Sequence, residues 1–362
     1  MTIGLEKHRQ AFAYCAYCPK VCRFACPVSE STHNESTSTW GKMTQAFLAT
    51  EKEKPAGEAA GNPLYACTGC MRCRSFCKHE NEVGLALFSA RQQPLEQGKA
   101  PAGARTTVES FEKFQNPFGP ELAQRAAAYR AEAPARYPLF PGCTSIMKSP
   151  EGVEDAVAVG AELGAPLAVA RAAGKCCGYP LYAAGAHEAF VAHAKEMAET
   201  LSSYGELVVV DPGCAYTFKV VYPLMGVELK PRVETVYEVL AARVQHAPAK
   251  APLELTVAYH DACHLGRGLG QYDPPRALLR AAVTEVREAT ANREEGGCSG
   301  GGGLLPRTMQ DTSVDIARRQ GDRLAPGDEL IVTACPTSRR MFERAGRRSS
   351  DLLTLVRRWL AV

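Results

Sequence analysis

The sequence CTGCMRCRSFC at residues 67–77 decides how the N-terminal part of this chain must fold. Its cysteines follow a C-x2-C-x2-C-x3-C spacing, in which three thiolates hold one 4Fe-4S cluster and the fourth reaches a second cluster. They are Cys67, Cys70, Cys73 and Cys77. A second run, CAYCPKVCRFACP at residues 15–27, supplies Cys15, Cys18, Cys22 and Cys26. Eight thiolates in two such runs predict two 4Fe-4S clusters.

The spacing predicts that each run sends its last cysteine to the other cluster. The first cluster would be held by Cys15, Cys18, Cys22 and Cys77, and the second by Cys67, Cys70, Cys73 and Cys26. The first run departs from the ideal by one residue, because three residues separate Cys18 from Cys22. Zinc is the alternative, since it also accepts four thiolates. Zinc ribbons usually carry two separated C-x2-C pairs, so the four-cysteine runs favour iron–sulfur clusters.

Composition narrows the class of protein. A chain of 362 residues with 46% hydrophobic residues is long enough for two or three compact units. A formal net charge of +3 is too small to indicate a nucleic-acid partner. The N-terminus, MTIGLEKHRQ, is charged where a signal peptide is apolar, and no apolar run reaches the length of a membrane span. We therefore predict a cytoplasmic protein that reaches the inner face of the membrane only through a partner. In that reducing compartment its fifteen cysteines indicate metal ligands rather than disulfides.

The fold class predicted is α+β overall, a helical dicluster domain at 1–91 followed by a duplicated α/β domain with parallel strands. Residues 92–138 are rich in Pro, Gly, Ala and Gln and are interpreted as a linker or wrapping arm. Segment 29–39 is polar and is predicted to be a solvated loop. Beyond it, strands are predicted at 206–210 and 329–333. Helices are predicted at 152–163, 187–201, 233–244, 276–287, 311–324 and 351–360.

The last seven cysteines reveal an internal repeat. Cys143, Cys177 and Cys214 recur about 120 residues later as Cys263, Cys298 and Cys335. Their contexts also match, because ELVVVDPGCAYTF at 206–218 resembles ELIVTACPTSRRMF at 329–342. Parallel α/β units present ligands at the carboxyl ends of their strands. We therefore expect two similar halves, related by a pseudo-twofold axis, whose cysteines meet at one cleft.

The motifs PGC at 141–143, KCCGYP at 175–180 and HDACH at 260–264 resemble those of the CCG-domain iron–sulfur proteins. That family includes the heterodisulfide reductase catalytic subunit, the glycolate oxidase iron–sulfur subunit and one of the subunits of anaerobic glycerol-3-phosphate dehydrogenase. The resemblance covers nearly the whole chain and implies CCG repeats at 139–250 and 251–362. In heterodisulfide reductase, each CCG copy supplies five cysteines to a non-cubane 4Fe-4S cluster.

Both repeats depart from that five-cysteine pattern. The first keeps four cysteines, Cys143, Cys176, Cys177 and Cys214, with Asp211 in the fifth place, and is expected to hold a third cluster. The second keeps Cys263, Cys298 and Cys335, with Gly297 and Ser338 in the vacant places. This second site is incomplete unless His260, Asp261, His264 or an external ligand completes it, and three cysteines with one histidine would equally suit zinc.

Taken together, these features predict an iron–sulfur subunit of an oxidoreductase complex. It would relay electrons between a flavoprotein dehydrogenase and a quinone or disulfide acceptor, with a membrane quinone-reducing subunit as a further candidate partner. One alternative is a heterodisulfide reductase-like catalytic subunit that reduces a disulfide at a CCG-bound cluster. Another is a ferredoxin carrying a structural CCG docking module. Near the ligands, Lys175 and Arg267 could offset a cluster's negative charge, and the glycine run 300–303 predicts a close backbone approach to a cluster.

Iron analysis tests the N-terminal prediction. Full-length chain purified without oxygen should contain about eight iron atoms from the two predicted ferredoxin-type clusters. Cys70→Ala should remove about four of them, because one cluster loses a ligand. Zinc in place of iron in the N-terminal part would contradict the assignment.

Overall fold

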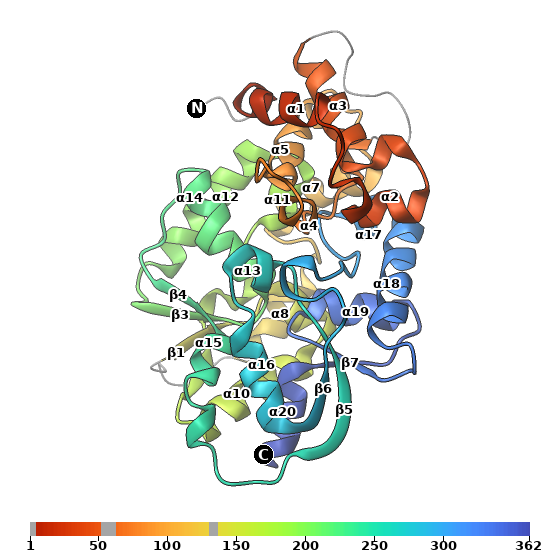
Figure 1. Cartoon of the computed structure of the whole chain (residues 1–362). Coiled ribbons are helices and arrows are strands. Elements are labelled where there is room, and N and C mark those ends of the chain that lie inside the picture. Colours follow the sequence, from red (N-terminus) through yellow and green to blue (C-terminus); the bar gives the residue numbers. More distant parts are fainter. Residues whose placement is uncertain (1–4, 52–62, 130–136) are drawn as a thin grey trace.

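The computed structural model describes residues 5–51, 63–129 and 137–362. Figure 1 shows the N-terminal helices, in red and orange, at one end of the molecule, with the sheets of the two repeats beside each other below them. The helices and 3-10 turns of the N-terminal domain are η1 Leu5–His8, α1 Arg9–Ala16, η2 Arg23–Ala25, α2 Pro27–Thr32, η3 Glu35–Thr37, α3 Thr39–Thr50, η4 Pro63–Tyr65, α4 Arg72–Ser75 and α5 Val83–Ala90.

Segment 29–39 is largely helical, so the prediction of a solvated loop is wrong. Pro27 is the first residue of α2. A proline is tolerated there because the backbone N–H that it lacks would have no partner within the helix. The side chain of Asn34 accepts a hydrogen bond from the amide of Ser36, and Ser38 accepts one from Gly41 at the start of α3. The polar residues of this segment therefore serve as helix caps.

The arm that follows also consists of helices over residues 92–129: α6 Gln92–Glu96, α7 Ala102–Phe114 and α8 Glu121–Ala127. Helix α7 packs on α11 of the first repeat and on α17 of the second, while α8 packs on α9. This part of the arm therefore wraps around both repeats. Residues 130–136 of the predicted arm lie outside the described residues, and its predicted limit at Pro138 falls inside strand β1.

Each repeat contains one four-stranded parallel sheet. The first sheet has the order β2-β1-β3-β4 and the second has the order β6-β5-β7-β8, which is the same topology. The strands of the first are β1 Tyr137–Phe140, β2 Leu167–Val169, β3 Glu206–Val209 and β4 Arg232–Thr235. Those of the second are β5 Leu253–His260, β6 Val283–Arg287, β7 Leu330–Thr333 and β8 Ser349–Asp351. All neighbouring strands pair in parallel.

The connecting helices and turns follow the strands in both repeats. In the first they are α9 Cys143–Lys148, α10 Pro150–Glu162, η5 Arg171–Gly174, α11 Tyr179–Ala184, α12 His187–Leu201, α13 Pro212–Tyr216, the π-turn η6 Thr217–Val221, α14 Tyr222–Leu224, α15 Val236–Ala241 and η7 Val244–His246. In the second they are the π-turn η8 His264–Gly268, α16 Asp273–Ala282, η9 Arg293–Glu295, α17 Leu305–Thr308, α18 Gln310–Leu324, α19 Pro336–Arg344 and α20 Leu352–Leu360.

The two repeats pack with reciprocal contacts. Helix α10 follows the first strand of its sheet and packs on α20, which follows the last strand of the other sheet. The equivalent pair, α16 and α15, packs in the same way. Buried Asp155 of α10 accepts hydrogen bonds from Arg357 (2.9 Å) and Thr354 (2.6 Å) of α20. This exchange of equivalent helices is the pseudo-twofold arrangement expected from the repeated cysteines.

Two predicted helices begin or end in strands. The segment predicted at 233–244 starts as β4 and becomes α15, because Thr235 forms a capping box with Glu238. The segment predicted at 276–287 contains α16 and then β6, whose Val283 pairs with Leu253 of β5. In both segments the strand residues pair with a neighbouring strand far away in sequence, Val233 with Leu207 and Val283 with Leu253, which helical periodicity alone does not predict. The other predicted helices and strands match α10, α12, α18, α20, β3 and β7 within about two residues.

Arg91 joins the three parts of the molecule. Its side chain is fully buried between α5 and α6. Within the N-terminal domain it donates hydrogen bonds to the carbonyl oxygens of Leu64 (2.9 Å) and Cys67 (2.9 Å). It also donates to Ala183 in the first repeat (2.6 Å) and to Gly303 in the second (2.9 Å). One guanidinium thus satisfies carbonyls from all three parts, using the fork of donors that only arginine provides.

We expect Arg91→Met to lower the thermal midpoint of the full chain and to destabilise it by about 3–5 kcal/mol, because four buried carbonyls lose a charged donor. Arg125→Met is the matched control, since Arg125 is exposed and lies 3.7 Å from exposed Glu121. Thermal unfolding of both variants, prepared without oxygen, measures the difference. Equal midpoints in the two variants would contradict the role of Arg91.

Candidate metal centres

The outer group consists of Cys15, Cys18, Cys22 and Cys77. Cys15 is buried at the end of α1, and the other three are half-buried in loops. Burial raises the pKa of the Cys15 thiol to about 12, and the charges of Cys22, Cys77 and Cys18 contribute to the rise, so the four sulfurs are close enough to act on one another. The amide nitrogen Nδ2 of Asn81 lies 3.1 Å from the Cys15 sulfur.

Two aromatic contacts join the loops of the outer group. Tyr14 stacks on His79, with ring centroids 4.9 Å apart, and Phe24 meets Phe76 edge to face at 4.8 Å. Each pair links the loop of the first cysteine run to the loop that carries Cys77. The last cysteine of the second run therefore lies with the first three of the other run.

The inner group consists of Cys26, Cys67, Cys70 and Cys73. Burial raises the pKa of Cys73 well above its usual value, and the charges of Cys70, Cys67 and Cys26, and to a smaller extent that of Cys22 in the outer group, contribute to the same rise. The ammonium of Lys42, itself only 2% exposed, lies 3.3 Å from the Cys26 sulfur. In the described structure each group therefore draws its members from both cysteine runs, and the assignment of one cluster to each group stays a prediction.

The first repeat gathers four buried sulfurs. Cys143 begins α9, directly after β1, and its sulfur lies 3.4 Å from that of Cys176. Hydrogen bonds from the thiols of Cys176 and Cys214 lower the pKa of Cys177. The sulfurs thus form a continuous chain in the order 143, 176, 177, 214. Behind the adjacent pair, Gly178 has a φ of +86°, which allows the sharp turn expected there.

The second repeat places its three cysteines differently. Cys298 is buried among residues of the N-terminal domain, where its thiol donates to the hydroxyl of Thr68 at 3.5 Å, and its proximity lowers the pKa of Cys70. Burial raises the pKa of Cys335 to about 12, with a further contribution from the charge of Asp211 in the first repeat. The second repeat therefore contacts the inner group on one side and the first repeat on the other.

Gln320 fills one vacant ligand place, which the sequence did not reveal. A Cβ atom added to Gly297 would lie 1.7 Å from Oε1 of Gln320, whose side chain is 5% exposed. Gly297 is the counterpart of Cys176 in the other repeat. A glutamine on α18, more than twenty positions away in sequence, thus occupies the space of a missing cysteine. Only the packing of α18 against this loop could show it.

Three residues were candidates to complete the second site. Asp261 instead accepts two hydrogen bonds from buried Arg276, at 2.7 and 2.8 Å. The ring of His260 bonds to Thr333 through Nδ1 at 3.1 Å. His264 alone of the three lines the cavity described next, with its ring stacked on Tyr216.

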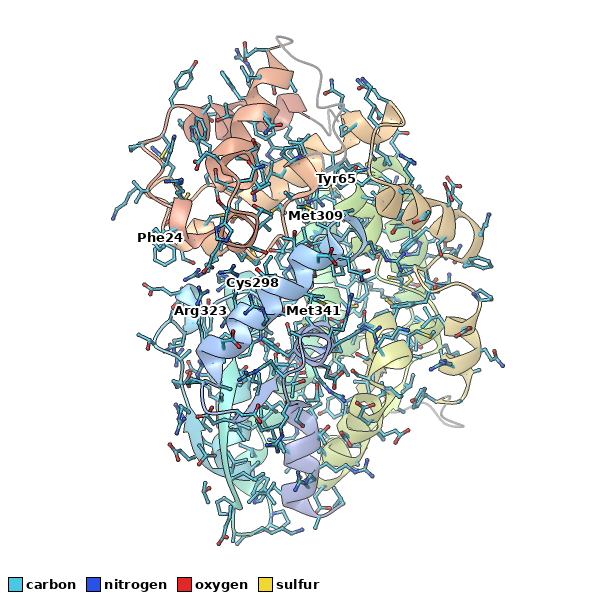
Figure 2. The ribbon with its side chains drawn as sticks, turned by 90° about the vertical axis from the view of Figure 1, so that its right-hand side faces the viewer. Phe24, Tyr65, Cys298, Met309, Arg323 and Met341 are labelled. Carbon is cyan, nitrogen blue, oxygen red and sulfur yellow. The ribbon has the colours of Figure 1, made fainter. Side chains whose placement is uncertain are left out.

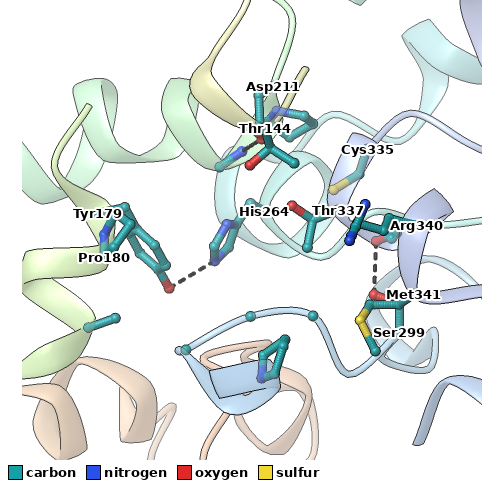
Figure 3. Close-up of a pocket in the computed structure, with 18 of the residues that line it drawn as sticks. Thr144, Tyr179, Pro180, Asp211, His264, Ser299, Cys335, Thr337, Arg340 and Met341 are labelled. Atoms are coloured by element: carbon teal, nitrogen blue, oxygen red, sulfur yellow. Dashed lines mark hydrogen bonds between the residues drawn. The ribbon is translucent and has the colours of Figure 1, made fainter. Parts of the chain in front are cut away.

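One cavity of about 460 Å³ lies between the repeats. All seven cysteines of the repeats line it, as the two equivalent strand edges predicted. Figure 3 shows Asp211, His264 and Cys335 around this space, with Tyr179 hydrogen-bonded to His264. Its cationic residues are Lys148, Arg307, Arg340 and Arg344, whereas Asp211 is the one carboxylate among the described lining residues. Burial raises the pKa of Asp211 to about 7.

The glycine run of the second repeat lies against the cysteine loop of the N-terminal domain. A Cβ atom at Gly302 would lie 2.2 Å from the carbonyl oxygen of Thr68, and one at Gly303 would lie 2.1 Å from that of Cys67. The glycine run therefore approaches the backbone of the loop that carries the inner group, and its approach to a bound cluster stays a prediction. Arg267 also lies there, whereas Lys175 is directed to Thr200, 3.3 Å away, and not toward the cysteines.

The residues present fit iron–sulfur clusters. Soft thiolates are the ligands that such clusters require, and they are collected here in buried or half-buried sets. Burial raises the pKa of Cys15 and Cys73, so these thiols resist ionisation until a bound metal removes the proton. Among residues 5–51, 63–129 and 137–362, no three His, Cys, Asp or Glu side chains converge at the distances of a single metal ion.

Comparison with known families agrees with this arrangement. A sequence-family model described as a 4Fe-4S dicluster domain matches residues 11–81. A model described as a cysteine-rich domain matches twice, at residues 137–219 and 257–343. The fold and the cysteine sets thus define an iron–sulfur protein with a dicluster domain and a duplicated cysteine-rich domain. The chain belongs to the CCG-domain iron–sulfur proteins.

Several curated proteins are similar over most of this chain. A subunit of the fumarate reductase (CoM/CoB) of Methanothermobacter marburgensis is 26% identical over 87% of this chain and 64% of its own length. EtfAB:quinone oxidoreductase of Syntrophomonas wolfei is 28% identical over 75% of this chain and 42% of its own. A subunit of the dihydromethanophenazine:CoB–CoM heterodisulfide reductase of Methanosarcina barkeri is 26% identical over 83% and 78%. The chain therefore spans less than two thirds of the first two relatives.

In the described part of the chain, every helix is too short or too polar to cross a bilayer.

The close approach at Gly303 can be tested. We expect Gly303→Ala to displace the loop of Cys67 and to lower the iron content by about four atoms per chain, because one cluster loses its cradle. Gly98→Ala is the matched control: its φ of +68° resembles the +59° of Gly303, but nothing lies within 4 Å of its added Cβ. Iron analysis of both variants separates backbone strain from steric contact. Full iron content in Gly303→Ala would contradict the prediction.

Proposed function

We propose that this chain is the iron–sulfur electron-transfer subunit of an oxidoreductase complex, passing electrons between a flavoprotein dehydrogenase and a quinone or disulfide acceptor. The observation that carries this proposal is the continuous order of outer group, inner group and cavity. Figure 2 shows Phe24, beside the outer group, at the surface of the N-terminal domain, and Cys298 at the boundary with the second repeat. The Cys298 thiol lies 3.5 Å from the hydroxyl of Thr68 and joins the two domains there.

In this proposal the outer and inner groups each hold one 4Fe-4S cluster. The charges that act on Cys15 are those of Cys22, Cys77 and Cys18, whereas Cys73 is affected more by Cys70, Cys67 and Cys26 than by Cys22, and this order supports the crossed assignment. Bound clusters of this kind supply one-electron steps. The protein's own part is to hold the two groups in order and to exclude water from the inner one, whose members Cys26, Cys67 and Cys70 are all buried.

A third cluster in the first repeat is part of the proposal. Its support is the buried chain of four sulfurs formed by Cys143, Cys176, Cys177 and Cys214. In the second repeat, Gln320 beside Gly297 and the hydroxyl of Ser338 at the other vacant place leave three sulfurs. We propose that this second site does not hold a complete cluster.

Electrons enter at the outer group in this scheme. Of the large apolar side chains exposed in the described structure, most surround it: Tyr14, Tyr17, Val21 and Phe24. Tyr17 is 81% exposed and Phe24 63%. Exposed apolar side chains clustered beside a redox group are typical of a protein–protein contact. A flavoprotein partner bound there would lie close to the outer cluster.

The relatives support the acceptor classes. One relative is named EtfAB:quinone oxidoreductase, and another is named as a subunit of a heterodisulfide reductase. Quinone and disulfide are therefore the two acceptors proposed for the complex in which this chain works. Iron–sulfur electron transfer is common to both.

Catalytic reduction of a disulfide inside this chain is a second candidate. The cavity favours it, because it is lined by cysteines of both repeats and by four cationic side chains that would attract an anionic substrate. The replaced cysteines at Asp211, Gly297 and Ser338 make it the weaker candidate. The docking-module alternative requires that the repeats bind no iron.

The order of the groups is tested by two variants of the full chain, loaded with iron and sulfide. Photoreduced FMN serves as the electron donor and a water-soluble naphthoquinone as the acceptor, and cluster absorbance reports both steps. We expect Cys22→Ala to slow reduction by FMN at least tenfold, because it removes the outer cluster. Cys214→Ala should be reduced at the normal rate but be reoxidised more slowly.

Thr106→Ala, a change at an exposed hydroxyl on α7, is the control and should alter neither rate. Normal reduction of Cys22→Ala would contradict entry through the outer group. Repeats without iron in otherwise loaded protein would support the docking module instead, and reduction of a small-molecule disulfide by the isolated chain would support the second candidate.

A further inference from the structure

The inner and outer groups differ in the charges buried around them. Lys42 lies on α3 with 2% of its surface exposed, and its ammonium contacts both the Cys26 sulfur (3.3 Å) and the carbonyl oxygen of Ala66 (2.7 Å). Its charge also acts on Cys67 and Cys73. Neither contact of the ammonium is a carboxylate, so its charge is directed to the inner group.

The second repeat adds another cation. Arg267 in η8 is 5% exposed and donates from Nε to the carbonyl oxygen of Cys70 at 2.7 Å. Its Nη1 donates to Gly296 at 2.8 Å, while Nη2 is buried without a hydrogen-bond partner in the described structure. The charge of Arg267 acts on Cys70 and Cys263. An arginine of the second repeat thus sits at the inner group, held by neutral carbonyls.

Arg91 is the third buried cation. Its guanidinium donates to the carbonyl oxygen of Cys67 at 2.9 Å and favours the charged form of that thiol. Like Arg267, it is bound by neutral carbonyls. Three positive charges, Lys42, Arg91 and Arg267, therefore surround the inner group, and the hydrogen bonds described for them above go to carbonyl oxygens and sulfur rather than to carboxylates.

In the outer group, the side chain that contacts a cysteine sulfur is the neutral amide of Asn81, whereas in the inner group it is the ammonium of Lys42. The cations near it are compensated or solvated. Arg74 pairs with Glu82 and Arg23 with Glu35, while Lys20 is exposed and lies over the Trp40 ring at 3.9 Å. Solvent screens such charges much more strongly than the interior does.

This asymmetry sets the relative ease of reduction. Reduction adds a negative charge, which a nearby buried cation stabilises strongly because the interior has a low dielectric constant. Net charge and hydrogen bonds to the sulfurs are known levers on the reduction potential of such clusters. Solvent near the outer group also stabilises the negative charge added on reduction, but more weakly than three buried cations do.

We propose that the buried cations Lys42, Arg91 and Arg267 give the inner group the higher reduction potential of the two, so that electrons entering at the outer group move inward to the cavity. This inference rests on the proposed function, since it requires a cluster in each group. Lys42 and Arg267 act through the field they impose on the sulfurs and are positioning residues, not catalytic ones. Because Arg267 comes from the second repeat, docking of the repeats completes the electrostatic environment of the inner group.

The test is a redox titration of the loaded full chain followed by electron paramagnetic resonance. Each signal is assigned by its loss in Cys22→Ala or Cys70→Ala. We expect the signal with the higher potential to disappear in Cys70→Ala. Lys42→Met and Arg267→Gln should each make reduction of that cluster at least tenfold less favourable, a shift of about 59 mV for one electron. Arg267→Lys should retain most of the wild-type potential.

Lys20→Met is the matched control, because it removes an exposed lysine beside the outer group and should shift neither potential. The two proposals fail differently. Wild-type chain without iron-based signals would overturn the proposed function and this inference together. Two clusters whose higher potential belongs to the outer group, or an unchanged potential in both Lys42→Met and Arg267→Gln, would overturn this inference alone. The assignment in the wild type needs no cation variant, so it holds even if one variant fails to fold.

Discussion

The buried guanidinium of Arg91 is the interaction on which the rest of the structure depends. It satisfies carbonyl oxygens in the N-terminal domain, the first repeat and the second repeat at once. A buried arginine is tolerated only where most of its donors are used, so the three parts must meet in one geometry. That geometry brings the loop of Cys67 against the backbone of Gly303. The contact that packs the second repeat on the N-terminal domain therefore also positions the loop of the inner cysteine group.

The same boundary has an electrostatic consequence. Two groups of four thiols create a large negative charge when they ionise, and the buried inner group has little water to balance it. Arg267 from the second repeat and Lys42 from the N-terminal domain supply the balance. A ferredoxin domain alone would lack Arg267 and Cys298. The duplicated domain thus completes the surroundings of the inner group in addition to providing its own cysteines.

The two repeats have the same topology but unequal chemistry. Both sheets have equivalent strand orders, and both place cysteines after their strands. The first retains four buried sulfurs, whereas in the second Gln320 occupies the space beside Gly297. Burial raises the pKa of Asp211 to about 7. This carboxyl group of the first repeat lies close enough to Cys335 of the second repeat to affect the pKa of its thiol. A symmetric scaffold can lose ligands on one side because the sheets and the exchanged helices, and not the metal site, hold the halves together.

The sequence by itself determined the dicluster domain, the duplication and the parallel sheets, because spacing and periodicity are local properties of a chain. The crossed grouping of the eight N-terminal cysteines is its further prediction. The sequence also predicted that Arg267 and the glycine run lie near a cluster, and the structure places both against the loop of Cys67 and Cys70. Tertiary structure alone decided that Arg91 joins three parts, that Lys42 faces the inner group and that Gln320 fills the place beside Gly297. The start of α15 and the end of α16 also depend on tertiary structure, because the residues next to them pair with neighbouring strands. In each case the partners are far apart in sequence, and only packing brings a buried charge or side chain to the atoms that it contacts.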